Sequence, residues 1–117
     1  MSTSKFRELT TKTNQHLAPL RAGLPDVMQG FGSLARSAMA PGVLDETTKE
    51  LIAMAIGVAM RCDDCLGFHA KALVRLGATE QQVHEMLGVA VYMGGGPSLM
   101  YAAHALEAFK EFSGGAG

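Results

Sequence analysis

The two cysteines of the chain, Cys62 and Cys65, lie close together in the stretch AMRCDDCLGFHAKAL, and His69 follows four residues after the second. A metal site, a structural disulfide, a redox pair and simple core packing can each account for a Cys-x-x-Cys pair. On a helix, Cys65 and His69 would share one face, one turn apart. A histidine placed there can relay the thiol proton and stabilise the thiolate, which is the reactive form. The spacing therefore favours redox chemistry.

A zinc site, a haem attachment or a structural disulfide would make less use of these residues. A structural zinc site needs four ligands, and the three residues above leave only Glu50 as a further candidate. A haem attachment needs a histidine directly after the second cysteine, where this chain has Leu66. A disulfide that closes so short a loop removes little entropy from the unfolded chain. In a redox pair, Cys62 could attack a sulfenic acid on Cys65, and a helix N-terminus would favour thiolates. Zinc binding and packing stay open as alternatives.

Composition sets the context for this site. The chain has 117 residues, of which 48% are hydrophobic and 18% charged, so we expect one globular domain over residues 1–117. The net charge is −1 with no basic block, which argues against a nucleic-acid partner. The first residues lack the apolar segment of a secretory signal, and the longest apolar run, LIAMAIGVAM, is shorter than the roughly 20 residues that span a bilayer. We expect a cytoplasmic protein with no membrane partner.

Helical signals follow one another along the chain, and the alternation typical of strands is nearly absent. A first helix is expected over residues 4–18, ending near Pro19, and a second between Pro25 and the APG at 40–42. Asp45 predicts the N-cap of a third helix, with Glu46 in its first turn. The fold class predicted from these signals is all-α, a helical domain of five to six helices.

The third helix is apolar on nearly all sides, so we expect it to be buried in the core or in a subunit interface. It should break near the cysteines, where Asp63 or Asp64 can cap the next helix, and the chain should reverse there to form an antiparallel helix pair. Gly77 is the expected C′ glycine of that fourth helix. Glu50 can reach the cysteines only if these two helices pack together.

The second half of the chain predicts two more helices. Thr79 and Gln82 fit a capping box, and Pro97 should start the last helix after a break at GGGP. SGGAG at the end is expected to be a flexible tail, and Tyr101 and His104 are expected to pack or to lie in an interface. The expected apolar positions of these two helices are Val83, Leu87, Val89, Ala90 and Val91, then Leu99, Ala103, Leu106 and Phe109.

The stretch KELIAMAIGVAMRCDDCLGFHAKALVRLGATEQQVHEML resembles the alkylhydroperoxidase D-like core of the carboxymuconolactone decarboxylase superfamily. The pattern of that family is a glutamate, a Cys-x-x-Cys twelve residues on, and a histidine four residues after the second cysteine. Glu50, Cys62, Cys65 and His69 match it position for position. LGAT and the GGGP that precedes YAAHALEAF also resemble the family, and the likeness covers about residues 40–112. It implies an alkylhydroperoxidase D-like helical fold.

The resemblance also implies an activity. It implies a thiol-dependent peroxidase that reduces alkyl hydroperoxides and is re-reduced by a dithiol or a lipoyl-bearing protein. Cys65 would attack the peroxide, Cys62 would resolve it, and His69 and Glu50 would relay protons, with no metal and no cofactor beyond the redox-active disulfide. Family members form trimers and hexamers, which implies a homo-oligomer. Two alternatives are a lyase of the carboxymuconolactone decarboxylase type, although such enzymes generally lack the cysteine pair, and a non-enzymatic thiol redox sensor.

Two features of the motif oppose each other. A helix N-terminus favours the thiolate of the first cysteine, Cys62, whereas His69 and the resemblance favour Cys65 as the nucleophile. Some alkylhydroperoxidase D proteins carry a histidine directly before the second cysteine, where this chain has Asp64. Carboxylates beside a thiolate disfavour its charge, so Asp63 and Asp64 should oppose thiolate formation.

Overall fold

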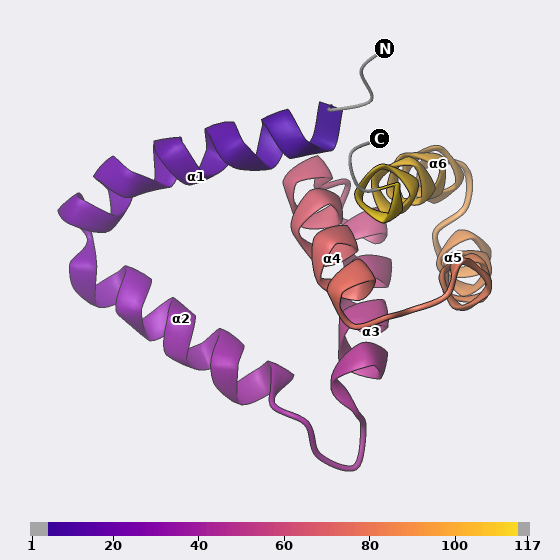
Figure 1. Cartoon of the computed structure of the whole chain (residues 1–117), viewed down its shortest axis with the longest axis horizontal. Helices are drawn as coiled ribbons and strands as arrows, with labels where there is room; N and C mark the ends of the chain where they lie inside the picture. The colour runs from indigo at the N-terminus through magenta and orange to yellow at the C-terminus, as the bar shows by residue number, and fades with distance from the viewer. Residues whose placement is uncertain (1–4, 115–117) are drawn as a thin grey trace.

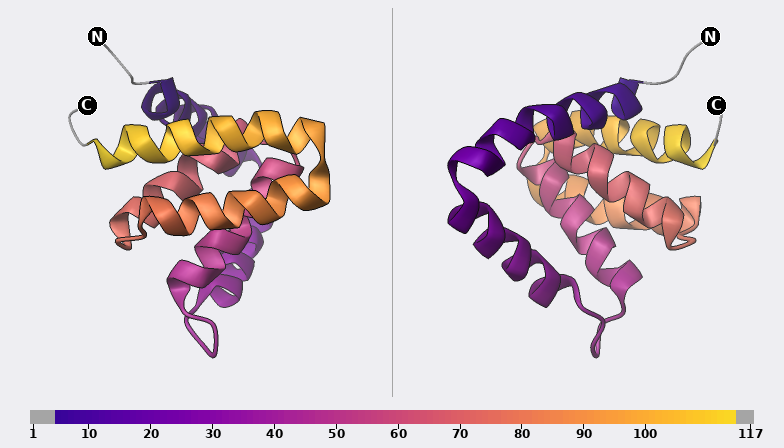
Figure 2. Two further views of the ribbon diagram at one scale, coloured as in Figure 1. Left: turned by 90° about the vertical axis from the view of Figure 1, so that its right-hand side faces the viewer. Right: turned by 60° about the vertical axis from the view of Figure 1, so that its left-hand side comes forward.

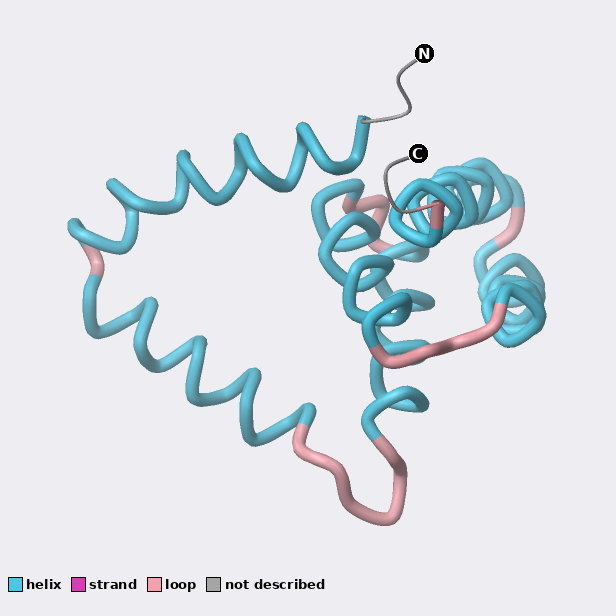
Figure 3. The backbone as a smooth tube through the Cα atoms, viewed as in Figure 1, coloured by secondary structure: helices cyan, strands magenta, loops and turns pink. Residues whose placement is uncertain are grey.

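Helices account for almost all of residues 5–114, the part of the chain that this computed structural model describes, and no strand forms there (Figures 1 and 3). The helices are α1 (Lys5–Gly23), α2 (Pro25–Met39), α3 (Glu46–Ala59), α4 (Asp63–Arg75), α5 (Glu80–Gly94) and α6 (Gly96–Ser113). The predicted all-α class is confirmed, with six helices in the described range. The predicted tail lies outside the described residues from residue 115 on, as does the expected helical start at residue 4.

The core lies between α3, α4, α5 and α6. α4 packs against α3 on one side, α6 on another and the first half of α1 on a third, while α5 and α6 run side by side (Figures 1 and 2). The largest fully buried side chains are Phe6, Met54, Leu66, Leu73, Val58 and Val83. α6 presents buried alanines to this core at Ala102, Ala105 and Ala108, and such small side chains let helices approach closely. The segment that carries the cysteines is therefore the start of a helix that packs against three others.

Helix ends follow the predicted signals at several places. The Asp45 carboxylate accepts the Thr48 N–H at 2.8 Å, and hydrogen bonding by Thr48 lowers the pKa of the Asp45 carboxyl. Thr79 and Gln82 form the complete capping box at the start of α5. Gly77 has φ 82° and follows the C-cap of α4, as predicted for a C′ glycine. These local signals set the start of α3, the end of α4 and the start of α5, and they involve only residues close together in the chain.

The first helix does not end near Pro19, as its sequence predicted, but continues to Gly23. A proline inside a helix removes one N–H donor to the carbonyl four residues earlier, and here the surrounding residues are exposed. Ala18, Leu20, Arg21 and Ala22 are good helix formers, which offsets the loss of that bond. The proline is accommodated rather than terminating α1.

The predicted apolar faces of the last two helices are wrong in part. Val89 is 63% exposed and Leu99 is 51% exposed, although both were expected on the buried side. Ala103 is also exposed, and the buried side of α6 instead contains Ser98 and Ala102. Both helices carry apolar residues on more than one side, so the period of the apolar pattern alone does not say which side meets the core.

Helices α1 and α2 form an arm that extends from the core (Figure 1). None of the residues Pro25–Met39 is buried, and this helix contacts only α1 and α3 within the described range. Its C-terminal end is held by Lys49 of α3, whose Nζ donates to the carbonyl oxygens of Ala38 (3.0 Å) and Ala40 (2.6 Å). Val27, Phe31 and Leu34 are therefore exposed apolar side chains on a helix whose position is fixed at its end. Within residues 5–114, no helix is both long and apolar enough to cross a membrane.

The N-terminal end of α1 is attached to α6 by a buried carboxylate. Glu111 is 5% exposed, and its two oxygens accept the backbone N–H groups of Phe6 (3.1 Å) and Arg7 (2.8 Å). The first N–H groups of a helix have no partner within the helix, so Glu111 supplies the acceptors that α1 lacks. Its negative charge also lies at the positive end of the helix dipole. Glu111 thus fixes the start of α1 against the core.

We expect Glu111→Gln to lower the free energy of unfolding by about 1–3 kcal/mol, because the amide NH₂ faces a backbone N–H that then lacks an acceptor. Urea unfolding followed by circular dichroism measures this. Glu107→Gln is the matched control, since Glu107 is exposed on the same helix one turn earlier and its substitution should change stability by less than about 0.5 kcal/mol. Equal effects of the two substitutions would contradict the capping role.

Candidate functional site

Both cysteines of the chain lie at the turn from α3 to α4, where they are joined as a disulfide with their Cα atoms 5.2 Å apart. Cys62 is the N-cap of α4, and its Sγ accepts the N–H of Cys65 at 3.1 Å. The expectation that Asp63 or Asp64 caps this helix is wrong, because the helix begins one residue earlier than that role requires. The two aspartates occupy the first turn instead, where negative charge is favoured by the helix dipole.

The chain reverses just before the cysteines. Arg61 adopts φ 57°, a left-handed conformation more usual for glycine, directly after the C-cap of α3. The N–H of Arg61 donates to the carbonyl of Val58, and the N–H of Cys62 donates to the carbonyl of Gly57. These two bonds form a Schellman motif, which closes the end of α3 and turns the chain back. The predicted antiparallel helix pair around the cysteines is confirmed.

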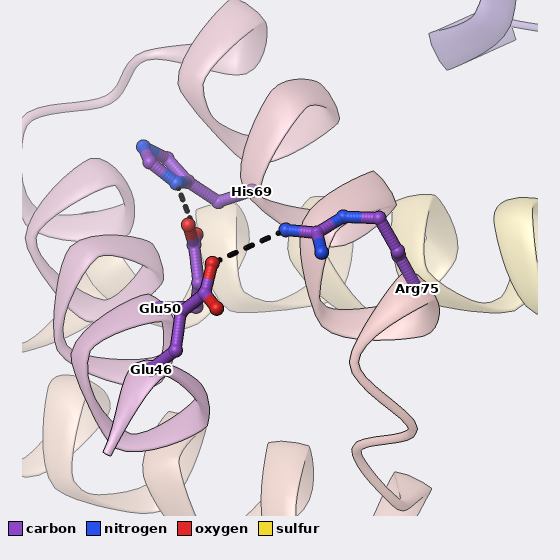
Figure 4. A network of polar contacts seen from close by, with 4 residues as sticks. All are labelled: Glu46, Glu50, His69 and Arg75. Atoms are coloured by element: carbon purple, nitrogen blue, oxygen red, sulfur yellow. Dashed lines mark hydrogen bonds and ion pairs between the residues drawn. The ribbon is translucent and has the colours of Figure 1, made fainter. Parts of the chain in front are cut away.

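Because the two helices are antiparallel, Glu50 of α3 returns alongside His69 of α4. The His69 Nδ1 lies 2.6 Å from Glu50 Oε1, and the two side chains point toward one another (Figure 4). Glu50 has 10% of its side chain exposed, whereas His69 has 31% exposed. A second contact, between Arg75 and Glu46 at 3.3 Å, joins the same two helices further along. The sequence correctly predicted that helix packing would bring Glu50 to this region.

Gly57 governs the approach of the two helices at the sulfurs. A Cβ atom at this position would lie 3.2 Å from the Cβ of Cys65 and 3.3 Å from a methyl group of Leu66. Both distances are shorter than ordinary van der Waals contacts, so a side chain here would push α4 away. Gly57 was not among the residues selected from the sequence. A single glycine within the apolar third helix could have indicated a close helix contact there.

Other helices bind both residues that separate the cysteines. His104 of α6 places its Nδ1 3.0 Å from an oxygen of Asp63, and the hydroxyl of Thr13 on α1 donates to Asp64 at 2.5 Å. No local pattern could have predicted these contacts, because the partners are 41 and 51 residues apart in the chain. His104 was expected to pack or to lie in an interface; it packs on the Tyr101 ring, is partly exposed and also contacts Asp63, which was not expected.

The arrangement limits what chemistry the site can perform. Cys62 and Cys65 are half-buried, and the hollow beside Asp63 has a volume of about 400 Å³. Within the described residues no group of three or more His, Cys, Asp or Glu side chains is arranged to hold a metal ion. A cysteine pair at a helix N-terminus can cycle between disulfide and dithiol, and a carboxylate–imidazole pair one turn away can move protons.

Comparison with known proteins gives consistent results. The carboxymuconolactone decarboxylase family model matches residues 25–108, which extends the likeness to α2, beyond the predicted start near residue 40. The apo crystal structure of a carboxymuconolactone decarboxylase family protein from Legionella pneumophila is 56% identical, with a TM-score of 0.92, and the match covers 94% of this chain and 98% of that one.

Two more distant relatives agree with this match. A carboxymuconolactone decarboxylase family protein from Thermotoga maritima, for which a role in the antioxidative response has been suggested, is 29% identical with a TM-score of 0.74, over 92% of this chain and 88% of that one. An uncharacterised protein from Cupriavidus necator is 37% identical over 107 residues, which are 92% of this chain and 95% of the relative. The likeness therefore extends over nearly the full length of each protein.

We expect Asp64→His to lower the pKa of the Cys65 thiol by up to about one unit, because it removes a carboxylate next to the sulfur and introduces a group that can carry positive charge. Thiolate absorbance against pH measures this in a Cys62→Ser background, where Cys65 alone titrates. Asp26→His is the control, since Asp26 is an exposed aspartate on α2, which does not contact α4. An unchanged or higher pKa in Asp64→His alone would show that position 64 does not tune the thiol.

Proposed function

The chain belongs to the carboxymuconolactone decarboxylase family as an alkylhydroperoxidase D-like member, and from this premise we propose that it is a thiol-dependent peroxidase that reduces alkyl hydroperoxides. One observation carries the proposal: the Cys62–Cys65 pair begins α4, and the Glu50–His69 contact lies one turn further along. The role suggested for the Thermotoga maritima relative supports the same reaction class.

In the first step, the Cys65 thiolate attacks an oxygen of the hydroperoxide. A sulfur–oxygen bond forms, the oxygen–oxygen bond breaks, and the leaving alkoxide takes a proton to become the alcohol. His69 supplies this proton, since it lies one helical turn from Cys65 and contacts the Glu50 carboxylate, with which it can exchange protons. Glu50 orients the imidazole through its Nδ1 atom. Cys65 is left as a sulfenic acid.

In the second step, Cys62 attacks the sulfur of that sulfenic acid. A sulfur–sulfur bond forms, the sulfur–oxygen bond breaks, and the hydroxide that leaves takes a proton and becomes water. The disulfide geometry in the first turn of α4 supports this step, since the two cysteines are already within bonding distance. An external dithiol, or the lipoyl group of a partner protein, then reduces the disulfide to two thiols and becomes oxidised itself. The proposal includes no metal and no cofactor beyond this disulfide. Because the cycle needs a reduced dithiol, we place the enzyme in the cytoplasm, where thiols are kept reduced.

The assignment of the two cysteines rests on competing influences. The sulfur of Cys62 accepts an amide hydrogen bond at the N-cap, which favours a thiolate there. Cys65 lies on the same helix face as His69 and so has a proton carrier beside it. A peroxidatic cysteine needs proton delivery to the leaving group as well as a thiolate, and we therefore assign the attack on peroxide to Cys65.

We also propose that the chain forms a homo-oligomer, a trimer or a hexamer as the family resemblance implies. The support is apolar surface that one copy leaves exposed: Phe31 of α2 is 67% exposed and Ile56 of α3 is 57% exposed. Exposed apolar area of this extent is typical of interfaces between subunits. α2 is the clearest case, since none of the residues Pro25–Met39 is buried.

The wild-type protein should consume an alkyl hydroperoxide in the presence of a dithiol and form a Cys62–Cys65 disulfide, visible in mass spectra as the loss of two hydrogens. Cys65→Ser should abolish turnover, whereas Cys62→Ser should leave Cys65 as a sulfenic acid or in an over-oxidised form. Full activity in Cys65→Ser would refute the assigned mechanism. Disulfide formation without catalytic turnover would indicate a redox sensor, and loss of a carboxylactone substrate would indicate a lyase.

Light scattering at micromolar concentration should give a mass of at least three chains. Phe31→Lys should reduce this mass, because it places a charge on the exposed apolar face of α2. Gln29→Lys is the matched control, since it adds the same charge at an exposed polar position of the same helix. A monomeric wild-type protein, or equal effects of the two lysines, would contradict assembly through this helix.

A further inference from the structure

A second carboxylate–histidine contact involves Asp63, which lies between the two cysteines in the chain. His104 of α6 places its Nδ1 3.0 Å from an oxygen of Asp63, the residue that directly follows Cys62. Both side chains are partly enclosed, with 35% of His104 and 34% of Asp63 exposed. Each cysteine therefore has its own carboxylate–imidazole pair nearby, Glu50–His69 for Cys65 and Asp63–His104 for Cys62.

The orientation of His104 is fixed from its own helix. Tyr101 lies one turn earlier on α6, and its ring centroid is 4.7 Å from that of His104, with the planes tilted by 52°. Tilted aromatic contacts at this separation are favourable, so Tyr101 helps to hold the imidazole with its Nδ1 toward Asp63. The contact is thus built from two elements that the core holds together, since α4 and α6 pack closely along their length.

We propose that His104 is a positioning residue for Cys62: it holds the Asp63 carboxylate toward α6 and offsets its charge, which favours the thiolate of Cys62. This inference rests on the proposed redox role of the cysteine pair. Asp63 follows Cys62 directly, and a free carboxylate there would disfavour a second negative charge on the sulfur. An imidazole that donates to the carboxylate, with or without its own positive charge, weakens that repulsion.

The thiolate of Cys62 matters in two steps of the proposed cycle. It attacks the sulfenic sulfur of Cys65 to form the disulfide and release hydroxide, which takes a proton to become water. When an external dithiol attacks the sulfur of Cys65, Cys62 leaves as a thiolate, which then takes a proton. A lower pKa of the Cys62 thiol means that more of it is present as the attacking thiolate in the first step, and that the thiolate leaves more readily in the second. A nearby imidazole can exchange the proton.

Other charged groups near Cys62 can also affect the pKa of its thiol. The neighbouring groups of α1 are Lys5, Glu8 and Lys12, which line the same hollow as Asp63, and Arg61 precedes Cys62 in the turn. Several charged side chains of the packed elements have partners of their own: Glu50 with His69, Glu46 with Arg75, Glu80 with Lys110 and Asp64 with Thr13. Lys71 of α4 and Glu107 of α6 are exposed. His104 is the group that meets Asp63 directly.

The test measures the ionisation of Cys62 in a full-length Cys65→Ser background, where it is the one remaining thiol. Thiolate absorbance against pH, and the rate of alkylation by iodoacetamide against pH, report the same group. His104→Ala should raise the pKa of Cys62 by about 0.3 to 1 unit, equal to about a twofold to tenfold lower thiolate fraction below the pKa. Asp63→Asn should lower the pKa, because it removes the carboxylate.

The double variant His104→Ala with Asp63→Asn separates charge from structure. With no carboxylate left to offset, it should titrate like Asp63→Asn alone, whereas a purely structural loss would leave it as impaired as His104→Ala. His84→Ala is the control, since His84 also faces a carboxylate, Glu80, but on α5. If His104→Ala leaves the pKa unchanged, or if the double variant stays raised, the inference is wrong.

Two further features of the design keep the result unambiguous. If His104→Ala does not fold, judged by circular dichroism, His104→Phe replaces it, because a phenyl ring can still pack on Tyr101 but cannot donate to Asp63, and it should give the same rise in the pKa of Cys62. No peroxide is present in these titrations, so a protein without peroxidase turnover can still give the expected shifts. Failure of this inference and failure of the proposed function are therefore distinguishable.

Discussion

The close packing of α3 against α4 is the constraint on which the site depends. Gly57 contributes to it in two ways: its missing side chain admits Cys65, and its carbonyl accepts the N–H of Cys62 where the chain turns back. The left-handed Arg61 completes this turn at a cost of about 1–2 kcal/mol for a non-glycine residue. In return, a glutamate on one helix and a histidine on the other meet at 2.6 Å. A side chain at position 57 would force α3 and α4 apart beside Cys65 and so disturb the packing that holds the cysteines near the Glu50–His69 pair.

The remaining helices hold α4 in place from its other sides. Gly67 lets α1 approach α4, since a Cβ atom there would meet the Thr10 methyl group at 2.7 Å, and Glu111 fixes the start of α1 on α6. Phe6, Arg7, Thr10 and Glu111 are distant from the cysteines in the chain, yet their contacts help to determine where α4 lies. α2 is different, because its position is set mainly by Lys49 at its end and none of its own residues is buried. The chain thus combines a half-buried site, held by several packed helices, with an arm whose apolar face has no cover within one copy.

Much of the fold could be predicted from sequence because its signals are local. Asp45, Gly77 and the Thr79–Gln82 capping box act within four residues of themselves, and the structure has all of them. Two errors were local: α1 continues past Pro19 because good helix formers surround the proline, and Cys62 rather than an aspartate caps α4. Another arose where tertiary packing decides, since Val89 is exposed because the core meets a different side of α5.

The site was predictable to a similar degree. The likeness to a family pattern selected the residues, and the antiparallel packing that brings Glu50 to His69 followed from a turn that local signals place between two helices. The contacts to Asp63 and Asp64 could not be predicted in this way, since Thr13 and His104 come from distant segments and no period links them to the cysteines. A pattern along the chain shows which residues can react, whereas the groups that tune them depend on how distant helices meet.

The two aspartates between the cysteines show why contacts from distant helices matter. In isolation, carboxylates at these positions would be free to turn toward the sulfurs, where they would oppose thiolate formation. Here each carboxylate has a partner on a different helix, Asp64 on α1 and Asp63 on α6, while both remain in the first turn of α4, where the helix dipole favours their charge. The sulfur of Cys62 accepts the N–H of Cys65 at the N-cap. The surroundings of the cysteines therefore depend on the packing of α1 and α6 against α4 as well as on the motif, so chains with the same Cys-x-x-Cys spacing can differ in thiol reactivity through residues far from it.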